Sequence, residues 1–311
     1  MRNNLIEPIK QEVYKYYDWI LCNQPTPSEI ENKFKDLKCS LDFKVMQKGY
    51  RNLEDLFSDM YFRTFTSDLR MEGVINFELF ENDTIRRRKE IIWGRELESE
   101  VTIVKNNLIE KIESYGKRSI TWAVSWYYND KIVQNKDYYS ELAEREWKNI
   151  GDISDITRTE NETEFYKVML NLEYNGLSKE EFIEKFKKNI MRSAELHEMY
   201  HNSKGYNPES FDDTVKEEKK AILTEMRYGD DQYYGLGRLL AVSNKPTIKA
   251  AHNIFRYFID AIHDDPEQFS QIDQSKIKIM EDDYREIMSQ MHKLTRENIK
   301  YIAEKMYRGL E

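Results

Sequence analysis

Residues 177–205 read LSKEEFIEKFKKNIMRSAELHEMYHNSKG, and this stretch decides the fold expected for the chain. Ser178 followed by Glu181 is the capping-box pattern that opens a helix, and Gly205 is a residue typical of a helix end. Apolar residues recur between these points at i, i+4 spacing, at Phe182, Phe186, Ile190 and Ala194. The pattern predicts one long amphipathic helix with its apolar face toward a core.

Two histidines continue this apolar stripe and enclose a glutamate, His197-Glu198-Met199-Tyr200-His201. The chain has only five histidines, so a chance H-E-x-x-H is expected on the order of once per hundred such chains. Imidazoles at i and i+4 can bind one Zn²⁺, and the carboxylate beside them can act as a general base. We therefore expect one zinc ion per chain, with His197 and His201 as ligands and Glu198 as the base. The alternative is a pair of helix histidines without a metal.

A third ligand must come from elsewhere, and the first candidate lies in DDTVKEEKKAILTEMRYG (212–229). Thr214 with Glu217 predicts the start of a helix, whose apolar stripe is Val215, Ile222 and Met226. Glu218 and Glu225 flank that stripe, so Glu218 could reach a metal, as in glutamate-type zincins. The alternative is that EEKK forms a solvated, charge-paired helix face.

The second candidate lies in YGDDQYYG (228–235), which resembles the end of a known peptidase motif. Asp231-Gln232-Tyr233-Tyr234-Gly235 resembles the D-x-x-Y-G end of the aspzincin motif G-T-x-D-x-x-Y-G. That family comprises the deuterolysins and the lysine-specific metalloendopeptidases. Residues 243–258, SNKPTIKAAHNIFRYF, are similar to a further stretch of the same family, so the resemblance covers roughly residues 190–262.

The resemblance implies a zincin-like catalytic fold and a role for three further residues. Asp231 would be the third zinc ligand, and the Tyr234 hydroxyl would donate to the oxyanion of the tetrahedral intermediate. Asn253 matches the aspartate that contacts the substrate in the lysine-specific members, and its neutral amide leaves a lysine preference in doubt. Tyr228-Gly229 stands where the family has Gly-Thr, so the turn before Asp231 is expected to differ. We place Asp231 ahead of Glu218 as third ligand.

The remainder of the chain predicts the domain organisation. Residues 1–115 have a helical pattern, including SEIENKFKDL (28–37), where Ser28 with Glu31 predicts the helix start, and SEVTIVKNNLIEKIESYG (99–116). Residues 119–134 are β-branched and aromatic and predict a hairpin with its turn at Asn129-Asp130. We expect a predominantly helical α+β protein with an N-terminal helical region at 1–115 and a zincin-like metallopeptidase domain at 116–311.

Composition limits the possible partners. The chain has 311 residues, 40% hydrophobic and 34% charged, which is typical of a globular protein. A net charge of −9 argues against a nucleic-acid partner, and we interpret the basic run at 86–89 as a solvated helix face. No stretch approaches about eighteen uncharged apolar residues, so we expect no membrane insertion. A cytoplasmic location is the default expectation, with delivery by a specialised secretion system left open.

These observations favour a zinc-dependent metalloendopeptidase that hydrolyses peptide bonds of a protein or peptide substrate. Two alternatives stay open. One is a glutamate-type zincin in which Glu218 completes the zinc site. The other is a non-enzymatic helical interaction protein with a vestigial metal site.

Overall fold

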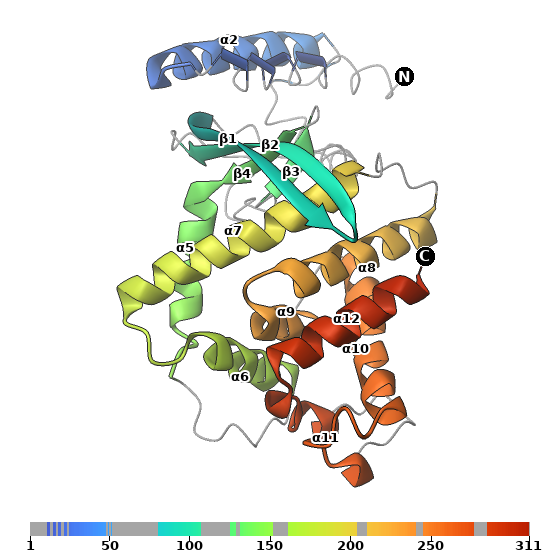
Figure 1. Ribbon diagram of the computed structural model, residues 1–311. Coiled ribbons are helices and arrows are strands. Elements are labelled where there is room, and N and C mark those ends of the chain that lie inside the picture. Colours follow the sequence, from blue (N-terminus) through green and yellow to red (C-terminus); the bar gives the residue numbers. More distant parts are fainter. Residues whose placement is uncertain are drawn as a thin grey trace. The chain divides into compact units, whose positions relative to one another are not determined.

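The computed structural model of the chain describes residues 25–47, 80–106, 125–128, 131–151, 161–203, 210–240, 245–276 and 285–310, with a few positions between 11 and 23 and at 49 and 51. The chain divides into two compact units (Figure 1). Unit 1 comprises Met1–Lys89 and Glu98–Tyr138, and unit 2 comprises Glu90–Leu97 and Tyr139–Glu311. The sequence-based prediction places the boundary after residue 115, whereas these units divide the chain after Tyr138 and assign the short segment at 90–97 to unit 2.

Unit 1 contains a helix and most of a four-stranded sheet. The helix is α2 (Pro27–Met46), and the strands are β1 (Phe80–Ile92), β2 (Arg95–Asn106), β3 (Ser125–Tyr128) and β4 (Lys131–Asn135). The strand order is β1-β2-β4-β3, with β2 parallel to β4 and β3 antiparallel to β4. Helices and a small sheet together confirm the expected predominantly helical α+β class.

The helix expected at 99–116 is wrong over its first half, because residues up to Asn106 belong to β2. Val101 pairs with Ile132 and Ile103 with Gln134, and both Val101 and Ile103 are buried. Pairing with a strand some thirty residues away outweighs the local helical pattern. The basic run at 86–89 also lies on a strand, β1, where half-buried and exposed side chains alternate.

The expected hairpin at 119–134 is confirmed in its paired strands, β3 and β4. Its turn at Asn129-Asp130 and the helix end expected at Gly116 lie outside the described residues. Helix α2 begins two residues earlier than expected, since Thr26 and Glu29 form its capping box.

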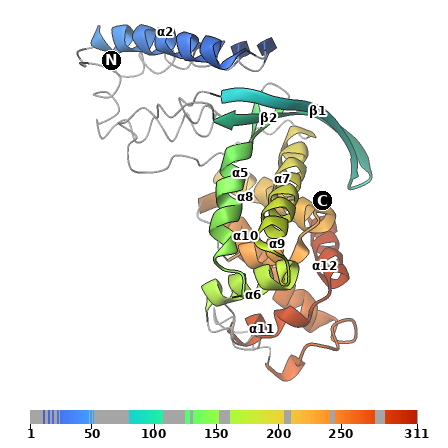
Figure 2. The same ribbon diagram turned by 90° about the vertical axis from the view of Figure 1, so that its left-hand side faces the viewer.

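Unit 2 is a helical assembly. Its long helices are α5 (Lys136–Trp147, whose first turn belongs to unit 1), α6 (Glu162–Tyr174), α7 (Lys179–Ser203), α8 (Phe211–Tyr228), α10 (Lys245–Asp264) and α12 (Arg296–Gly309). Shorter segments are α9 (Gln232–Arg238), α11 (Arg285–Met288) and the 3-10 turns η2 (Gln274–Lys276) and η3 (Met291–Lys293). Helix α8 packs against α7, α10 and α12, and α9 packs against α6 (Figures 1 and 2).

The ends of α7 and α8 show how far local signals determine these helices. The capping box expected for α7 is confirmed: the Ser178 amide donates to Glu181 over 2.9 Å and the Glu181 amide donates to the Ser178 hydroxyl over 3.2 Å. Gly205 lies outside the described residues. Helix α8 begins at Phe211, capped by Ser210 rather than by Thr214, so its predicted start was one turn late.

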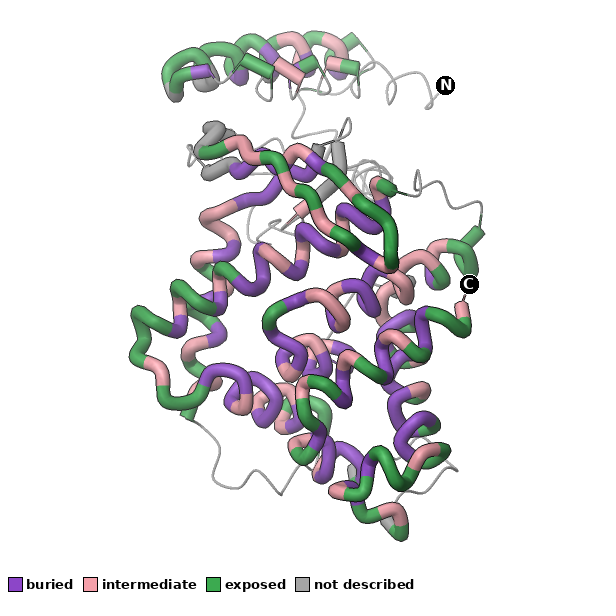
Figure 3. Tube along the Cα trace, viewed as in Figure 1, coloured by how far each residue is buried: buried purple, intermediate pink, exposed green. Residues whose placement is uncertain are grey.

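The core of unit 2 lies where α8 and α10 meet their neighbours. Buried positions lie on several sides of α8, because α8 packs against α7, α10 and α12 (Figure 3). Helix α8 is therefore central to the core of the unit. Phe165 of α6 packs edge-on against Phe255 of α10, with ring centroids 5.6 Å apart. No helix among the described residues is long and apolar enough to cross a membrane.

Replacement of Phe255 by alanine should test this core. Its side chain is fully buried (0% exposed), so Phe255→Ala should lower the free energy of unfolding by about 3–5 kcal/mol, measured by urea denaturation. Phe211→Ala is the matched control, because Phe211 is 52% exposed and its loss should cost less than about 1 kcal/mol. Equal costs for the two variants would contradict this assignment of the core.

Candidate metal centre

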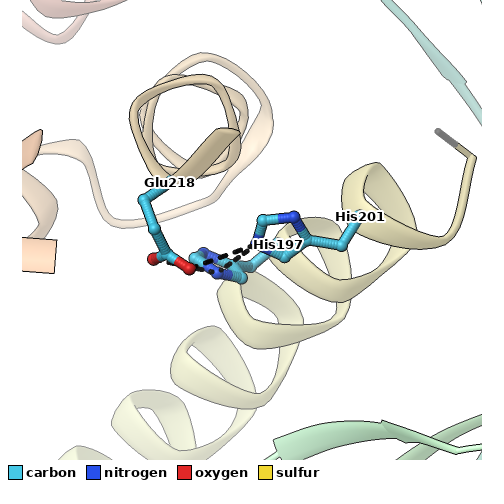
Figure 4. Close-up of side chains that lie close together, drawn as sticks. All are labelled: His197, His201 and Glu218. Atoms are coloured by element: carbon cyan, nitrogen blue, oxygen red, sulfur yellow. Dashed lines mark hydrogen bonds and ion pairs between the residues drawn. The ribbon is translucent and has the colours of Figure 1, made fainter. Parts of the chain in front are cut away.

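Three side chains from two neighbouring helices converge in unit 2. His197 and His201 extend from α7 and Glu218 extends from α8, and one ligand atom of each lies within 4.8 Å of the other two (Figure 4). The two histidine Nε2 atoms are 3.1 Å apart. The Glu218 carboxylate oxygens lie 3.8 Å from Nε2 of His197 and 3.6 Å from Nε2 of His201. The structure therefore brings Glu218, the alternative third ligand, to the H-E-x-x-H histidines.

The spacing of these atoms fits a small divalent cation. Two nitrogen ligands about 2.05 Å from a tetrahedral zinc ion lie roughly 3.3 Å apart. The 3.1 Å between the histidine nitrogens is close to that value, and the carboxylate needs to approach by only a few tenths of an ångström. Two imidazoles and one carboxylate are also a donor set that suits zinc better than calcium or magnesium.

Helix α7 places the histidines by continuing its buried stripe. Phe182, Phe186 and Ile190 of that stripe are buried, as expected, while Ala194 is half-buried. Residues four apart lie above one another on a helix, so the two imidazoles extend from the same face. His201 is buried and His197 is partly buried, which leaves His197 at the more open side of the group.

The other ring nitrogen of His197 is held by a second carboxylate of α8. His197 Nδ1 lies 2.6 Å from Oε1 of Glu225. A proton on Nδ1, donated to this carboxylate, leaves the Nε2 lone pair directed at the group formed with His201 and Glu218. A carboxylate that orients a histidine in this way is the usual outer-shell arrangement of metal-binding histidines. Arg238 of α9 then lies 3.8 Å from the other oxygen of Glu225.

Gly229, the residue that caps α8 after Tyr228, lies close to α7. Its amide donates to the carbonyl of Glu225 over 2.7 Å. A Cβ at this position would lie 2.5 Å from that carbonyl oxygen and 3.1 Å from the Ser193 hydroxyl of α7. A side chain here would clash with the last turn of α8 and crowd Ser193, which lies on α7 one helical turn before His197.

The protonation of the two histidines follows from these contacts. Burial alone would lower the pKa of His197, but the hydrogen bond to Glu225 and the nearby charges of Glu218 and Glu198 raise it to about 9. Burial lowers the pKa of His201; the charge of His197 acts in the same direction, and the nearby Glu218 carboxylate, 3.6 Å away, opposes the shift. The residues alone thus favour one proton between the two Nε2 atoms, and a cation would take the place of that proton.

Glu218 is held in its ionised form. Burial opposes ionisation, but the neighbouring His201 imidazole and the charge of His197 lower the pKa of Glu218 to about 2. The hydroxyl of Thr247, in the first turn of α10, donates to Glu218 Oε2 over 3.2 Å. Helix α10 therefore helps to orient the carboxylate that completes the group.

Glu198 lies next to this group with a different protonation behaviour. Burial raises the pKa of Glu198 to about 7; the charge of His197 opposes this shift, and those of Glu218 and Glu225 add to it. A carboxyl group with a pKa near neutrality can both accept and donate a proton under physiological conditions. This property matches the general-base role expected for Glu198.

Asp231, which we expected to be the third ligand, lies in a different polar cluster. It is buried immediately before α9 and accepts hydrogen bonds from Ser193 over 3.2 Å and from Tyr174 over 3.4 Å. The Tyr174 hydroxyl in turn accepts a hydrogen bond from Asn189 over 3.2 Å. The group formed by His197, His201 and Glu218 does not include Asp231. Both of its carboxylate oxygens instead join α9 to α7 and α6.

The contacts of Tyr234, and the position of Asn253, are as follows. The buried ring of Tyr234 packs edge-on against Phe186 and Tyr166, and burial raises the pKa of its hydroxyl. The guanidinium of Arg238 lies 5.7 Å from the centre of this ring. Asn253 is half-buried within α10, a turn and a half beyond Thr247.

The sequence does not predict that Glu225 and Thr247 contact the site. Glu225 was recognised as flanking the apolar stripe of α8, but nothing in the sequence indicated that His197 would contact it. Thr247 carried no signal, because its helix joins the site through tertiary packing alone. Comparison of the chain with family models, with curated proteins and with solved structures finds no match.

The environment of Asp231 predicts a measurable pH dependence. Burial, together with the charge of Glu173, raises its pKa to about 7 from an ordinary value of 3.8, while Ser193 opposes the shift. The folded chain then holds a proton that the unfolded chain releases, so stability falls as the pH rises between about 4 and 7. Asp231→Asn mimics the protonated carboxyl and should remove that part of the slope, measured by urea unfolding at pH 5, 6, 7 and 8.

The exposed neighbour offers a control for this experiment. Asp230→Asn removes a carboxyl group from the surface and should keep the wild-type slope. An Asp231→Asn variant that unfolds with the same pH dependence as the wild type would show that Asp231 is ionised in the folded chain.

Proposed function

We propose that this protein is a zinc-dependent metalloendopeptidase in which His197, His201 and Glu218 bind one zinc ion per chain. The observation that carries the proposal is the convergence of these three side chains, with His197 oriented by Glu225 on its other ring nitrogen. The ligand set is that of a glutamate-type zincin rather than the aspartate type that the sequence resembles. A zincin-like fold for unit 2 belongs to the same proposal.

The number of protein ligands favours catalysis over a structural metal. Structural zinc sites are closed by four protein ligands, whereas catalytic sites use three and leave one position for water or substrate. Three residues form the group found among the described residues, and Glu225 is already engaged by His197. The ion would supply a Lewis acid and lower the pKa of a coordinated water toward neutrality.

The side chains around the ligands account for the proton transfers of peptide hydrolysis. Glu198 would take a proton from the attacking water and later deliver it to the departing amine nitrogen. Its pKa of about 7 suits both steps. Glu225 would keep the proton on Nδ1 of His197, so that Nε2 remains a ligand throughout. The H-E-x-x-H motif, with its glutamate as general base, is typical of enzymes that hydrolyse peptide bonds.

Zinc content should distinguish the two candidate third ligands. Wild-type protein, loaded with zinc and dialysed, should retain about one ion per chain by elemental analysis. Glu218→Gln should leave far less than one ion per chain, because it removes a charged ligand, whereas Asp231→Asn should keep the wild-type content. The reverse result would support the aspartate-type site, and a wild type that takes up no zinc would overturn the proposal.

Replacement of the base should separate catalysis from metal binding. Glu198→Gln keeps the size of the side chain but cannot accept the proton, so turnover should fall about 10²- to 10⁴-fold with zinc content unchanged. The assay is digestion of a sequence-diverse peptide library, followed by mass spectrometry. Glu184→Gln makes the same change at an exposed position of α7 and should leave turnover within about twofold. Zinc-loaded wild type that cuts no peptide would instead favour the non-enzymatic interaction protein.

A further inference from the structure

The β1–β2 hairpin ends in a two-residue turn, Trp93-Gly94, that belongs to unit 2. Both residues have positive φ, 51° for Trp93 and 73° for Gly94. Positive φ at both central residues is the signature of a type I′ turn, for which Asn-Gly is strongly preferred. A bulky residue in this conformation is uncommon and energetically unfavourable. The presence of tryptophan here calls for a compensating interaction of its side chain.

The Trp93 side chain makes compensating contacts with residues of α8 and α12. Its indole stacks on Tyr307 of α12, with centroids 3.7 Å apart and planes 6° from parallel. It also meets Tyr228 of α8 edge-on at 5.2 Å, and the Tyr228 hydroxyl accepts a hydrogen bond from the Trp93 amide over 2.9 Å. The indole N–H donates to the hydroxyl of Thr224 over 2.7 Å.

These contacts reach the helix that carries the candidate ligand and the orienting carboxylate. Thr224 immediately precedes Glu225, and its fully buried hydroxyl also donates to the Lys220 carbonyl of the preceding turn. The hydroxyl is therefore bound from both sides, by α8 itself and by the indole. On the other side of the stack, Tyr307 meets Tyr200 edge-on at 6.3 Å, next to His201 on α7. Trp93 thus contacts α8 directly and reaches α7 through one ring.

We propose that Trp93 is a positioning residue of the metal centre. Its contacts would fix the rotation of α8 about its own axis and the position of α8 along that axis, so that Glu218 and Glu225 face the histidines. This inference rests on the proposed function, since its consequence is measured in zinc affinity. A small rotation of α8 would move both carboxylates together, because they are seven residues, about two turns, apart on one face. The indole hydrogen bond and the ring stack oppose such a rotation.

The alternative is that Trp93 only closes the hairpin or fills the core. Trp93→Asn separates the two roles, because asparagine suits the first position of the type I′ turn better than tryptophan does. If Trp93 serves only the turn, this variant should be neutral or improved. If Trp93 positions α8, the variant should bind zinc more weakly while the hairpin remains formed.

The experiment measures the zinc dissociation constant by competition with a chromogenic chelator, on full-length protein shown to be folded by circular dichroism. Loss of a direct outer-shell partner typically weakens metal affinity about 10- to 100-fold, so Trp93, one contact further out, should cost roughly 3- to 10-fold in Trp93→Asn. Trp93→Phe keeps a ring for stacking but loses the N–H donor and should show part of this loss.

Variants of the partner hydroxyl keep the test decisive if Trp93→Asn does not fold. Thr224→Val removes the acceptor of the indole N–H and should match Trp93→Phe, whereas Thr224→Ser should restore wild-type affinity. The double variant Trp93→Phe/Thr224→Val should be no weaker than the weaker single variant, because both remove the same hydrogen bond. Trp147→Phe is the aromatic control: the ring of Trp147 packs on Phe182, near the start of α7 and about four turns before His197, and its replacement should leave zinc affinity unchanged.

The outcomes separate this inference from the proposed function. Wild-type zinc affinity in every Trp93 and Thr224 variant would overturn the positioning role and leave the metallopeptidase proposal intact. An equal loss in Trp147→Phe would also overturn it, because a packed tryptophan elsewhere in unit 2 would then have the same effect. A wild-type protein that binds no zinc would overturn both.

Discussion

The packing of α7 against α8 is the contact on which the site depends. Helix α7 supplies both imidazoles, but they acquire a ligand partner and an orientation only where α8 lies close enough. At the end of α8, a side chain in place of Gly229 would clash with the carbonyl of Glu225 and crowd the hydroxyl of Ser193 on α7. Along the interface, Glu225 contacts Nδ1 of His197 and Glu218 faces its Nε2. One helix pair thus carries all three proposed ligands and the carboxylate proposed to orient one of them.

The electrostatics of this interface favour a cation. Three carboxylates, Glu198, Glu218 and Glu225, influence one histidine and together raise its pKa to about 9 in spite of burial. A divalent ion in place of the proton would balance the negative charge of these carboxylates and would bind the nitrogen and oxygen lone pairs directly. The raised pKa of Glu198 has the same origin, because burial and its carboxylate neighbours disfavour its ionised form. The proposed metal binding and the proposed proton transfer would thus both depend on one arrangement of charge.

The cluster around Asp231 supports this arrangement without belonging to it. Ser193 lies one helical turn before His197 and donates to Asp231, while Tyr174 approaches the same carboxylate from α6. A buried carboxyl with these partners fixes the start of α9 against α7. The aspartate of the D-x-x-Y-G stretch thus lies in a buried hydrogen-bonded cluster between α6, α7 and α9. An isolated aspartate and tyrosine at matching spacing do not reveal which buried partners they will meet.

The sequence by itself determined the features that depend on neighbouring residues. The start of α7 at its capping box and the shared face of its two histidines follow from helical geometry over a few turns. Only tertiary structure decided what meets that face. Glu218 and Asp231 are 17 and 30 residues beyond His201, and the choice between them depends on how α8 and α9 pack. Strand β2, with a helical pattern of its own, was likewise decided by pairing with β4. Local periodicity determines which face of a helix a side chain lies on. Which elements pack next to one another depends on burial and backbone pairing summed over the whole unit.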